Sequence, residues 1–561
     1  MKGAILLAFV LCCRFCLGVK VTSWTSRADA VKSAIRHAWL GYKKFAYMSD
    51  DLRPVSQTGS RWLHSRATLY DALDTLYLAG FYEEFDAVVH EINTEIMGPP
   101  TSVLHGVKVF EYHIRIVGGL LGAYSVSRKR ELLLHAQLAA DCVLSTFDSA
   151  TGLPRMYGRM ANPSTSPLLS RVAFVLDSTW AVLDKNAWCN TLSGIGSFGL
   201  ELRALSRETG RLKYKHAAEK IEQVIYKEWK HRNVHEGFLH KYWNIPPPWL
   251  NRSTSIQSCG LTQREIAFGS GGDSFYEYLL KEQILAPRDT KHLAELYDAF
   301  IMSVHGSMND GARSVVYTSS DNRHTLVHLN MRNISPHLVC FGGGLLALGA
   351  LHFKRRKNDM QLAQEFGEQC FQFYKTPTGL AADVNEIHND GTASPFSGHA
   401  NYQLRPETVE TLFILFRTTK NEKYREMGWE IFQAIEKHCK VQSGGYSGIK
   451  DVLQVPPEHD DYMPSFFLAE TLKYLLLLFQ EDEQLPLAEY IFTTEGHPIS
   501  ISPTCEPDTN EMKTPVCSGS SQLSVWQTNW DVVGMAGGLC VCAWLKSNKK
   551  KTRSVNSSKN K

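Results

Sequence analysis

The chain has 561 residues, of which 43% are hydrophobic and 21% charged, the composition of an ordinary globular protein that can bury a large core. The formal net charge is +3, but the last sixteen residues hold seven basic and no acidic residues, which leaves −4 on the rest. This mildly acidic body excludes the basic surface of a nucleic-acid-binding protein. The spacing of a zinc site and the Gly-Lys-Ser/Thr loop of a phosphate site are also absent from the sequence.

The N-terminus carries an apolar run over residues 3–13 after Lys2, followed by the small residues Cys16 and Gly18. The run is too short to span a bilayer comfortably. It predicts a signal peptide over residues 1–18, cleaved near Gly18, or a short signal anchor. Both interpretations place the rest of the chain in an oxidising compartment of the secretory pathway.

Residues 24–502 show apolar side chains at spacings of three and four, as in Leu468 and Leu472, which is the period of helices. A long heptad run is absent, so a coiled-coil bundle is disfavoured, and no internal linker marks a second domain. We therefore expect one all-α domain over residues 24–502. It should be a barrel of paired helices with short β-hairpins near residues 315–318 and 444–447.

The composition of the sequence changes after Pro503. Residues 503–531 are polar and predict a loose linker, and residues 532–561 combine a short apolar segment with a basic tail. A helix over the fourteen apolar residues covers about 21 Å, less than the ~30 Å hydrocarbon core of a bilayer. The basic flank suits the cytosolic side of a membrane anchor, but a terminal core segment explains the apolar run equally well, and both alternatives stay open.

Six acidic residues lie within apolar segments that have the periodicity of helices. They are Glu111, Asp273, Glu277, Glu407, Glu410 and Glu470. A carboxylate is rarely buried without a partner, and one such residue alone predicts a structural ion pair. Six of them, spread over about 360 residues, predict convergence on one polar cavity. Paired carboxylates in a cleft are what the hydrolysis of a glycosidic bond requires.

The cysteines and sequons fit the oxidising compartment. Eight of the thirteen cysteines lie between the leader and the late apolar run, a density too low for a disulfide scaffold. They predict one or two disulfides on a large core, and Cys505 and Cys517 are close enough in sequence to form a local one. Asn251 and Asn333 begin sequons for N-glycosylation.

Six motifs follow one another in a set order: residues 67–76 (ATLYDALDTL), 110–115 (FEYHIR), 272–281 (GDSFYEYLLK), 337–341 (HLVCF), 404–407 (LRPE) and 465–474 (SFFLAETLKY). This set resembles the class I α-1,2-mannosidases, glycoside hydrolase family 47, from about Ala38 to Pro498. The resemblance implies an (α/α)7 barrel with a calcium ion at its base. It also implies hydrolysis, with inversion, of terminal α-1,2-linked mannose from the high-mannose N-glycans of glycoproteins.

The resemblance assigns three catalytic carboxylates. Glu111 matches the general acid, which acts through a water, and Asp273 matches a second carboxylate of the proton network. Glu407 matches the general base that activates the attacking water. An inverting hydrolase needs separate groups because it protonates the leaving oxygen on one face and deprotonates water on the other. The acid then needs a raised pKa and the base a lower one.

Further residues carry roles in substrate binding. Arg115 and Arg405 are placed to hold nearby carboxylates ionised. His337 matches a residue that contacts the distorted sugar, and Phe466 matches the aromatic platform beneath it. The residues that match binders of sugar hydroxyls or of calcium-bound waters are all glutamates: Glu277, Glu410, Glu470 and Glu495.

The resemblance also implies one metal ligand and one disulfide. Thr494 matches the direct calcium ligand, giving hydroxyl and carbonyl oxygens. One residue is few for a cation that takes six to eight oxygens, and waters and sugar hydroxyls supply the rest in the family. Cys340 and Cys370 match the family's disulfide between successive helical segments.

Two glycines depart from the processing members. Gly194 stands where a substrate-contacting Glu is usual, and Gly496 stands where Ala is usual and degradation-enhancing members carry Gly. The intact motif at 337–341 is by contrast typical of processing members. Two functions therefore remain: an active processing mannosidase, or a glycan-binding factor of endoplasmic-reticulum quality control with weak or no hydrolysis. Gly271, where endoplasmic-reticulum enzymes carry Arg, favours the Golgi over the endoplasmic reticulum. We expect a monomer.

Overall fold

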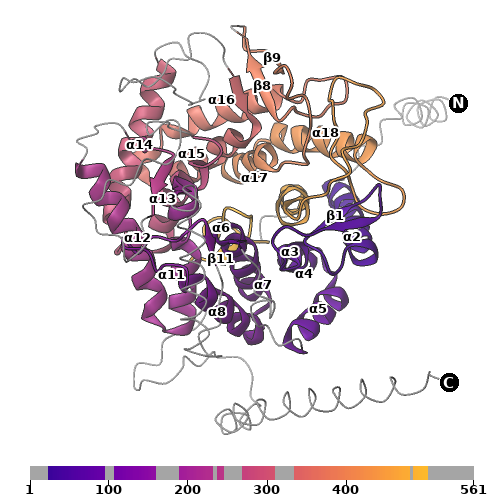
Figure 1. Ribbon diagram of the computed structural model, residues 1–561. Helices are drawn as coiled ribbons and strands as arrows, with labels where there is room; N and C mark the ends of the chain where they lie inside the picture. Colours follow the sequence, from indigo (N-terminus) through magenta and orange to yellow (C-terminus); the bar gives the residue numbers. More distant parts are fainter. Residues whose placement is uncertain are drawn as a thin grey trace, which may run out of the picture. The chain divides into compact units, whose positions relative to one another are not determined.

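Helices dominate the computed structural model, which describes residues 23–94, 106–158, 189–231, 237–245, 268–309, 334–388, 390–480 and 484–502. The colours of the chain run once around a ring of helices, and the first and last helical segments meet (Figure 1). These residues belong to one compact unit, Met1–Pro503, and residues 504–561 form a second unit. The predicted leader, linker and basic tail lie outside the described residues, and the domain boundaries stay predictions.

Within the described ranges, the ring has an outer layer of seven helices and an inner layer of seven, if α3 and α4 are counted as one. The outer helices are α2 (Trp24–Phe45), α5 (Tyr82–Thr94), α8 (Arg130–Leu144), α12 (Leu212–His231), α14 (Lys291–Asn309), α16 (Asp359–Gln372) and α18 (Lys423–His438). The inner helices are α3 (Ala67–Asp71) with α4 (Leu73–Leu78), α7 (Gly118–Ser127), α11 (Gly199–Thr209), α13 (Asp273–Leu285), α15 (Phe341–His352), α17 (Glu407–Thr419) and α19 (Leu472–Phe479).

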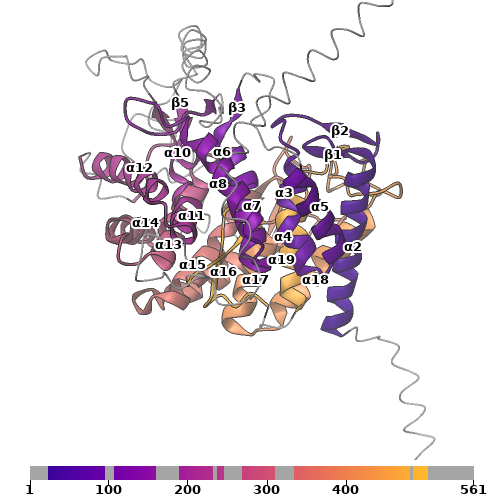
Figure 2. The ribbon, with the colours of Figure 1, turned by 90° about the horizontal axis from the view of Figure 1, so that it is seen from below.

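The two layers follow from apolar patterning. An outer helix such as α18 is amphipathic and buries one stripe, which includes Tyr424, Ile431 and Ile435. An inner helix such as α15 is buried from Phe341 to Gly349, because it is covered by its partner on one side and by the barrel interior on the other. Each inner helix packs against the next one, and α19 with its preceding turn closes the ring against α2, α3 and α4. Figure 2 shows α2 and α18 side by side at this closure.

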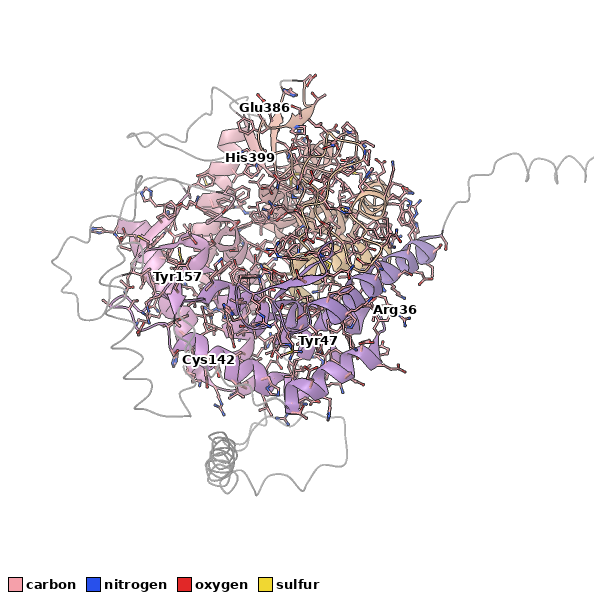
Figure 3. All side chains as sticks on the ribbon, turned by 45° about the vertical axis from the view of Figure 1, so that its right-hand side comes forward. Arg36, Tyr47, Cys142, Tyr157, Glu386 and His399 are labelled. Carbon is pink, nitrogen blue, oxygen red and sulfur yellow. A yellow bond between two sulfur atoms is a disulfide. The ribbon has the colours of Figure 1, made fainter. Side chains whose placement is uncertain are left out.

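Side chains crowd the space between the two layers (Figure 3). Short helical segments complete the ring: α6 (Val109–Tyr112), η1 (His113–Val117), α10 (Leu192–Gly196), η3 (His337–Cys340), η4 (Lys354–Arg356) and η5 (Phe467–Thr471). Two of them, η1 and η5, are single π-helical turns, a distortion that is frequent at functional sites. Both carry predicted site residues, Arg115 and Glu470.

The strands of the described residues are short and antiparallel, as predicted. They pair as β1 (Asp51–Arg53) with β2 (Thr58–Ser60), β3 (Val107–Lys108) with β4 (Tyr157–Gly158), β5 (Cys189–Thr191) with β6 (Tyr242–Asn244), β7 (Ile334–Pro336) with β8 (Val384–Ile387) and β9 (Ala393–Pro395), and β10 (Tyr490–Phe492) with β11 (Pro498–Ser500). The hairpin predicted near residues 444–447 is reduced to a tight turn, in which Lys440 and Tyr446 form an isolated antiparallel bridge and the N–H of Ser447 donates to the Cys439 carbonyl at 2.7 Å. Paired glycines there favour a turn over a longer strand. Residues 315–318 lie outside the described part.

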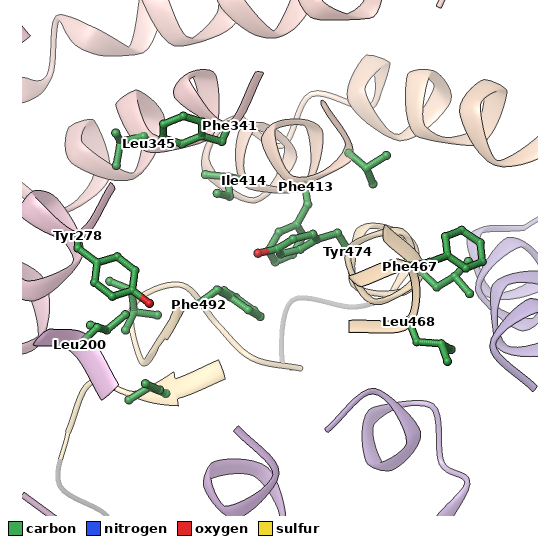
Figure 4. Packing of buried hydrophobic residues seen from close by; sticks show 14 of the residues in the cluster. Leu200, Tyr278, Phe341, Leu345, Phe413, Ile414, Phe467, Leu468, Tyr474 and Phe492 are labelled. Atoms are coloured by element: carbon green, nitrogen blue, oxygen red, sulfur yellow. The ribbon is translucent and has the colours of Figure 1, made fainter. Parts of the chain in front are cut away.

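The β10–β11 hairpin enters the barrel from its last inner helix and packs against α7 and α13. Phe492 of this hairpin contacts Phe413 of α17 and Tyr474 of α19, with ring centroids 5.6 and 5.7 Å apart. Figure 4 shows these rings and Tyr278 of α13 gathered around the hairpin. The interior of the barrel is therefore filled by side chains around one inserted turn.

The cysteines of the described residues include one complete pair. Cys340 at the end of η3 and Cys370 of α16 form a disulfide with Cα atoms 5.9 Å apart, the pairing that the resemblance implied. Cys189 is also disulfide-bonded, while Cys142 and Cys439 are buried free thiols. Within the described ranges, no helix is both long and apolar enough to cross a membrane.

Candidate active site

The predicted carboxylates occupy the N-terminal ends of inner helices and the turns beside them. Asp273 and Glu277 begin α13, Glu407 and Glu410 begin α17, and Glu470 lies in η5. A helix N-terminus is a favourable place for negative charge, since its free N–H groups point outward. The predicted glutamates that are buried are Glu277, Glu407, Glu410, Glu470 and Glu495.

Glu407 is held from two sides. Nδ1 of His337 lies 2.7 Å from its Oε2, and a guanidinium nitrogen of Arg405 lies 3.9 Å from its Oε1. Burial favours the neutral acid, but the hydrogen bond from His337 and the charge of Arg405 outweigh it and lower the pKa of Glu407. An ionised carboxylate is what a general base requires.

His337 is oriented by its other ring nitrogen. Because a carboxylate only accepts, Nδ1–H donates to Glu407, and Nε2 accepts from the hydroxyl of Tyr374 at 2.9 Å. His337 is 1% exposed, so the structure makes it a partner of the base. Its predicted contact with the sugar stays a prediction. Arg405 in turn donates from Nε to Asp383, a partner that the sequence motifs did not reveal.

Asp273 has the opposite electrostatic setting. It is half-buried at the start of α13, and its Oδ1 accepts the N–H of Ser274 at 2.9 Å. Burial, together with the negative charges of Glu277 and Glu407, raises the pKa of Asp273 to about 7. A carboxyl that is still protonated near neutral pH suits the acidic side of a proton network.

Glu111 is tied to the barrel interior through Arg115. The two side chains lie one turn apart, and Nε of Arg115 donates to Oε2 of Glu111 at 3.0 Å. The same guanidinium donates to Oγ of Ser465 at 2.8 Å, to Asp71 at 3.2 Å and to Glu495 at the hairpin turn. Arg115 therefore fixes Glu111, which keeps 27% of its side chain exposed.

Two of the other buried glutamates, Glu277 and Glu410, flank Lys281. Lys281 donates to Glu277 and lies 4.0 Å from Oε1 of Glu410. Burial raises the pKa of Glu410 to about 8, although Lys281 opposes the shift. Burial and the charge of Glu495 raise the pKa of Glu470 well above its ordinary value. The interior holds more carboxylates than cations, so it attracts additional positive charge.

Thr494 lies in the turn between β10 and β11. It is half-buried, whereas Thr493 and Glu495 beside it are buried. Its N–H donates to the Tyr278 hydroxyl at 3.3 Å, and Nζ of Lys473 donates to the Gly496 carbonyl at 2.8 Å. Hard oxygen donors next to surplus carboxylates fit Ca²⁺, although no described group of three or more His, Cys, Asp or Glu could hold a metal ion by itself.

The departing glycines have structural reasons. At Gly496, φ is +71° and a Cβ would lie 3.0 Å from Cγ of Glu470, so the turn itself calls for glycine. At Gly194, a Cβ would lie 2.2 Å from Oδ1 of Asn190, a buried side chain that donates to the Pro154 carbonyl at 3.0 Å. A glutamate at 194 therefore requires Asn190 to move.

The space beside Gly271 is filled by a neighbouring lysine side chain. A Cβ at this position would lie 2.8 Å from Cε of Lys241. The glycine also has φ of +89°, a conformation that other residues rarely adopt. Lys241 thus brings its own cationic side chain to the place where Gly271 leaves room.

A second buried network was missed by sequence reasoning. Asp74 accepts from Lys473 at 2.7 Å and pairs with Nδ1 of His497 at 2.8 Å, and all three side chains are fully buried. Asp71 lies 3.3 Å from the other nitrogen of His497. The sequence does contain a signal for this network: Asp71 and Asp74 lie three positions apart in an apolar helical segment.

Phe466 is half-buried and follows Ser465, the acceptor for Arg115, so it borders the same space as Glu111. The side chains that keep some exposure are the three charged residues Glu111, Asp273 and Arg405, with Phe466 and Thr494. They come from five separate segments. They are therefore the part of the predicted site that a ligand can reach.

Comparisons with known proteins agree with this arrangement. The family model described as glycosyl hydrolase family 47 matches residues 34–501. The chain is 33% identical over 489 residues to mannosyl-oligosaccharide 1,2-alpha-mannosidase IB of Mus musculus, covering 85% of this chain and 70% of that protein. It is 34% identical over 487 residues to endoplasmic reticulum mannosyl-oligosaccharide 1,2-alpha-mannosidase of Homo sapiens, covering 85% and 64%.

A solved structure extends the likeness to three dimensions. The alpha-1,2-mannosidase from Trichoderma reesei superposes with a TM-score of 0.69 at 25% identity, over 85% of this chain and 99% of that one. The likeness confirms the (α/α)7 barrel expected from the sequence. Because the family model spans most of the chain and the relatives exceed 30% identity over most of its length, this protein belongs to glycosyl hydrolase family 47.

Proposed function

We propose that the protein hydrolyses terminal α-1,2-linked mannose from high-mannose N-glycans of glycoproteins, with inversion. The observation that carries the proposal is the opposite tuning of two carboxyls: the pKa of Glu407 is lowered, whereas the pKa of Asp273 is raised to about 7. Two carboxyls whose environments push their pKa values apart are suited to base and acid roles. The names of the relatives support the choice of substrate.

In the proposed reaction Glu407 takes a proton from a water as its oxygen attacks C1 of the terminal mannose. The bond from C1 to the glycosidic oxygen breaks, and that oxygen receives a proton from the acidic side, where Glu111 acts through a water and Asp273 completes the proton network. His337 and Arg405 keep Glu407 ionised and oriented. Arg115 fixes Glu111. Attack on the face opposite the leaving group inverts C1.

A calcium ion fits the base of this site. Thr494 would hold it through its hydroxyl and carbonyl oxygens, and Glu410, Glu470 and Glu495 would bind the waters around it. When bound, the ion supplies positive charge that offsets the buried carboxylates and orients sugar hydroxyls. Support comes from the raised pKa values of the buried glutamates, which mark negative charge without enough compensation.

The names of the relatives support a location in the secretory pathway. We place the protein in the lumen of the secretory pathway, in the Golgi, with the endoplasmic reticulum as the alternative. The Golgi assignment rests on Gly271, and Lys241 beside it favours the alternative because it supplies a basic side chain in that space. The extent of mannose trimming distinguishes the Golgi from the endoplasmic-reticulum assignment. The Golgi assignment predicts trimming beyond the first mannose, to a glycan with five mannose residues.

The experiment compares the release of mannose from α-1,2-, α-1,3- and α-1,6-linked mannobiose by the wild type and by Glu407→Gln. We expect release from the α-1,2 isomer alone, and a fall of at least ~10²-fold in turnover for the variant with binding retained. Binding of high-mannose glycans without any release by the wild type would contradict the proposal and favour the glycan-binding factor.

A further inference from the structure

Asp51 collects three donors from segments far apart in the chain. It lies in β1 and is 1% exposed. Its Oδ2 accepts from Nε1 of Trp62 and from the hydroxyl of Tyr462, both at 2.5 Å, and its Oδ1 accepts the N–H of Ser465 at 3.0 Å. Because both ring donors meet one oxygen, the two aromatic side chains are held beside each other.

The two rings are also adjacent to the predicted acid. The guanidinium carbon of Arg115, which donates to Glu111, lies 5.6 Å from the centre of the Trp62 ring. The negative charge of Glu111 acts on Tyr462 too: burial, Asp51 and Glu111 together raise the pKa of its phenol. Arg115 donates to Ser465 as well, so Asp51, Trp62, Arg115 and Ser465 close a cycle of contacts that includes the partner of Glu111.

The rings are only partly buried, unlike Asp51, which holds them. Trp62 and Tyr462 keep intermediate exposure, and the exposed Lys108 places its ammonium 5.2 Å from the Trp62 ring centre. A buried carboxylate that only joined the two ends of the barrel would need no open aromatic surface. Here two amphipathic rings remain accessible beside a group that acts on the leaving oxygen.

We propose that Asp51 is a positioning residue that fixes Trp62 and Tyr462 as an aromatic wall for the sugar on the leaving-group side of the scissile bond. The inference rests on the proposed function, because it takes Glu111 as the acid. The ring faces carry partial negative charge and attract the weakly positive C–H face of a pyranose. Lys108 adds a donor for its hydroxyls.

The test compares Trp62→Leu with wild type on two substrates. α-1,2-Mannobiose places a sugar against the wall, whereas α-mannosyl fluoride has no leaving-group sugar. We expect KM for mannobiose to rise about tenfold, the effect of losing one favourable aromatic contact, with kcat changed by less than a factor of about two. Hydrolysis of the fluoride should be unchanged.

Trp429→Leu is the matched control. Trp429 is also half-buried and carries an arginine over its ring, with Arg27 at 4.9 Å, but it lies on the outer helix α18. Tyr462→Phe removes one donor to Asp51 and keeps the ring, so it tests whether the hydrogen bonds to Asp51 position the aromatic wall. KM for mannobiose should rise by a smaller factor than in Trp62→Leu. It also gives a milder second variant if Trp62→Leu fails to fold.

The outcomes separate the inference from the function on which it rests. An unchanged KM in Trp62→Leu, or equal losses on both substrates, would overturn the aromatic wall. A loss of the same size in Trp429→Leu would overturn it as well, because the effect would then reflect general destabilisation. A wild-type protein that hydrolyses neither substrate would instead contradict the proposed function.

Discussion

Nδ1 of His337 lies 2.7 Å from Oε2 of Glu407, and the hydroxyl of Tyr374 donates to the other nitrogen of the same ring. The relay fixes both the tautomer of the histidine and the position of the carboxylate. It links the HLVCF motif to the LRPE motif across 70 residues of sequence. The chemistry of the base is therefore set by a contact that neither motif contains alone.

Replacing His337 by alanine should impair the base without removing it. Because the hydrogen bond helps to lower the pKa of Glu407, its loss should raise that pKa and move the acidic limb of the activity profile to higher pH. Misplacement of the carboxylate should also reduce kcat by up to about 10²-fold. Steady-state kinetics across pH measure both effects. Tyr374→Phe keeps the His337–Glu407 contact and should shift the limb less, whereas an unmoved limb in His337→Ala would contradict the relay.

The pH profile of kcat/KM should be bell-shaped. Activity needs ionised Glu407, whose pKa is lowered, so the acidic limb should lie below the ordinary range of a glutamate. Activity also needs protonated Asp273, whose pKa is about 7, so activity should fall as the pH rises through 7. Asp273→Asn cannot ionise and should lose this alkaline limb along with most activity. A flat profile from pH 6 to 9 in the wild type would be inconsistent with these roles.

Calcium removal should lower activity and stability together. A ligand that binds only the native state stabilises it by about 2.7 kcal/mol at a hundredfold excess over Kd, so EDTA should lower the melting temperature and added calcium should restore it. Thr494→Ala removes one ligand oxygen and keeps the carbonyl, so calcium titration followed by thermal unfolding should show a higher Kd. Thr419→Ala, at the end of α17, is the control. Full activity and an unchanged melting temperature in excess EDTA would refute the site.

Lys473→Met should destabilise the fold by about 3–5 kcal/mol, because it removes the lysine from a fully buried ion pair and leaves Asp74 with His497 alone. Lys473 and Asp74 are both 0% exposed and 2.7 Å apart. Lys43 pairs with Glu84 at the same distance on the surface, and Lys43→Met should change the free energy of unfolding by less than about 1 kcal/mol. Urea unfolding of the two variants measures the difference. Similar effects in both would show that burial is not what matters.

Particular residues show how far the sequence could predict the site. Glu407 and Glu410 could be singled out as candidate site residues because carboxylates are uncommon within apolar helical segments. The contact between Tyr462 and Asp51 was not, since 411 residues separate them in sequence and no local pattern encodes the meeting. Gly271 is a related case: the side chain that lies beside it, Lys241, comes from a different segment, so the sequence around Gly271 does not reveal it.

Most of the fold was also predictable from local sequence patterns. The prediction was poorest where glycines dominate the sequence. Apolar spacings of three and four revealed the inner and outer helices, because burial on one or all faces leaves a periodic trace. The turn at 444–447 has no such period, and its two glycines at positive φ form a turn with an isolated bridge. Short pairings such as β10 with β11 depend on tertiary contacts and leave little local signal.

The central claim is that Glu407 activates a water on the face opposite the leaving group. Proton NMR of the first mannose released from α-1,2-linked mannobiose tests it directly, before the two anomers equilibrate. The account predicts that β-mannose appears first and that the α-anomer grows in only by mutarotation. Initial release of α-mannose would contradict it, because retention requires a covalent intermediate on a nucleophile.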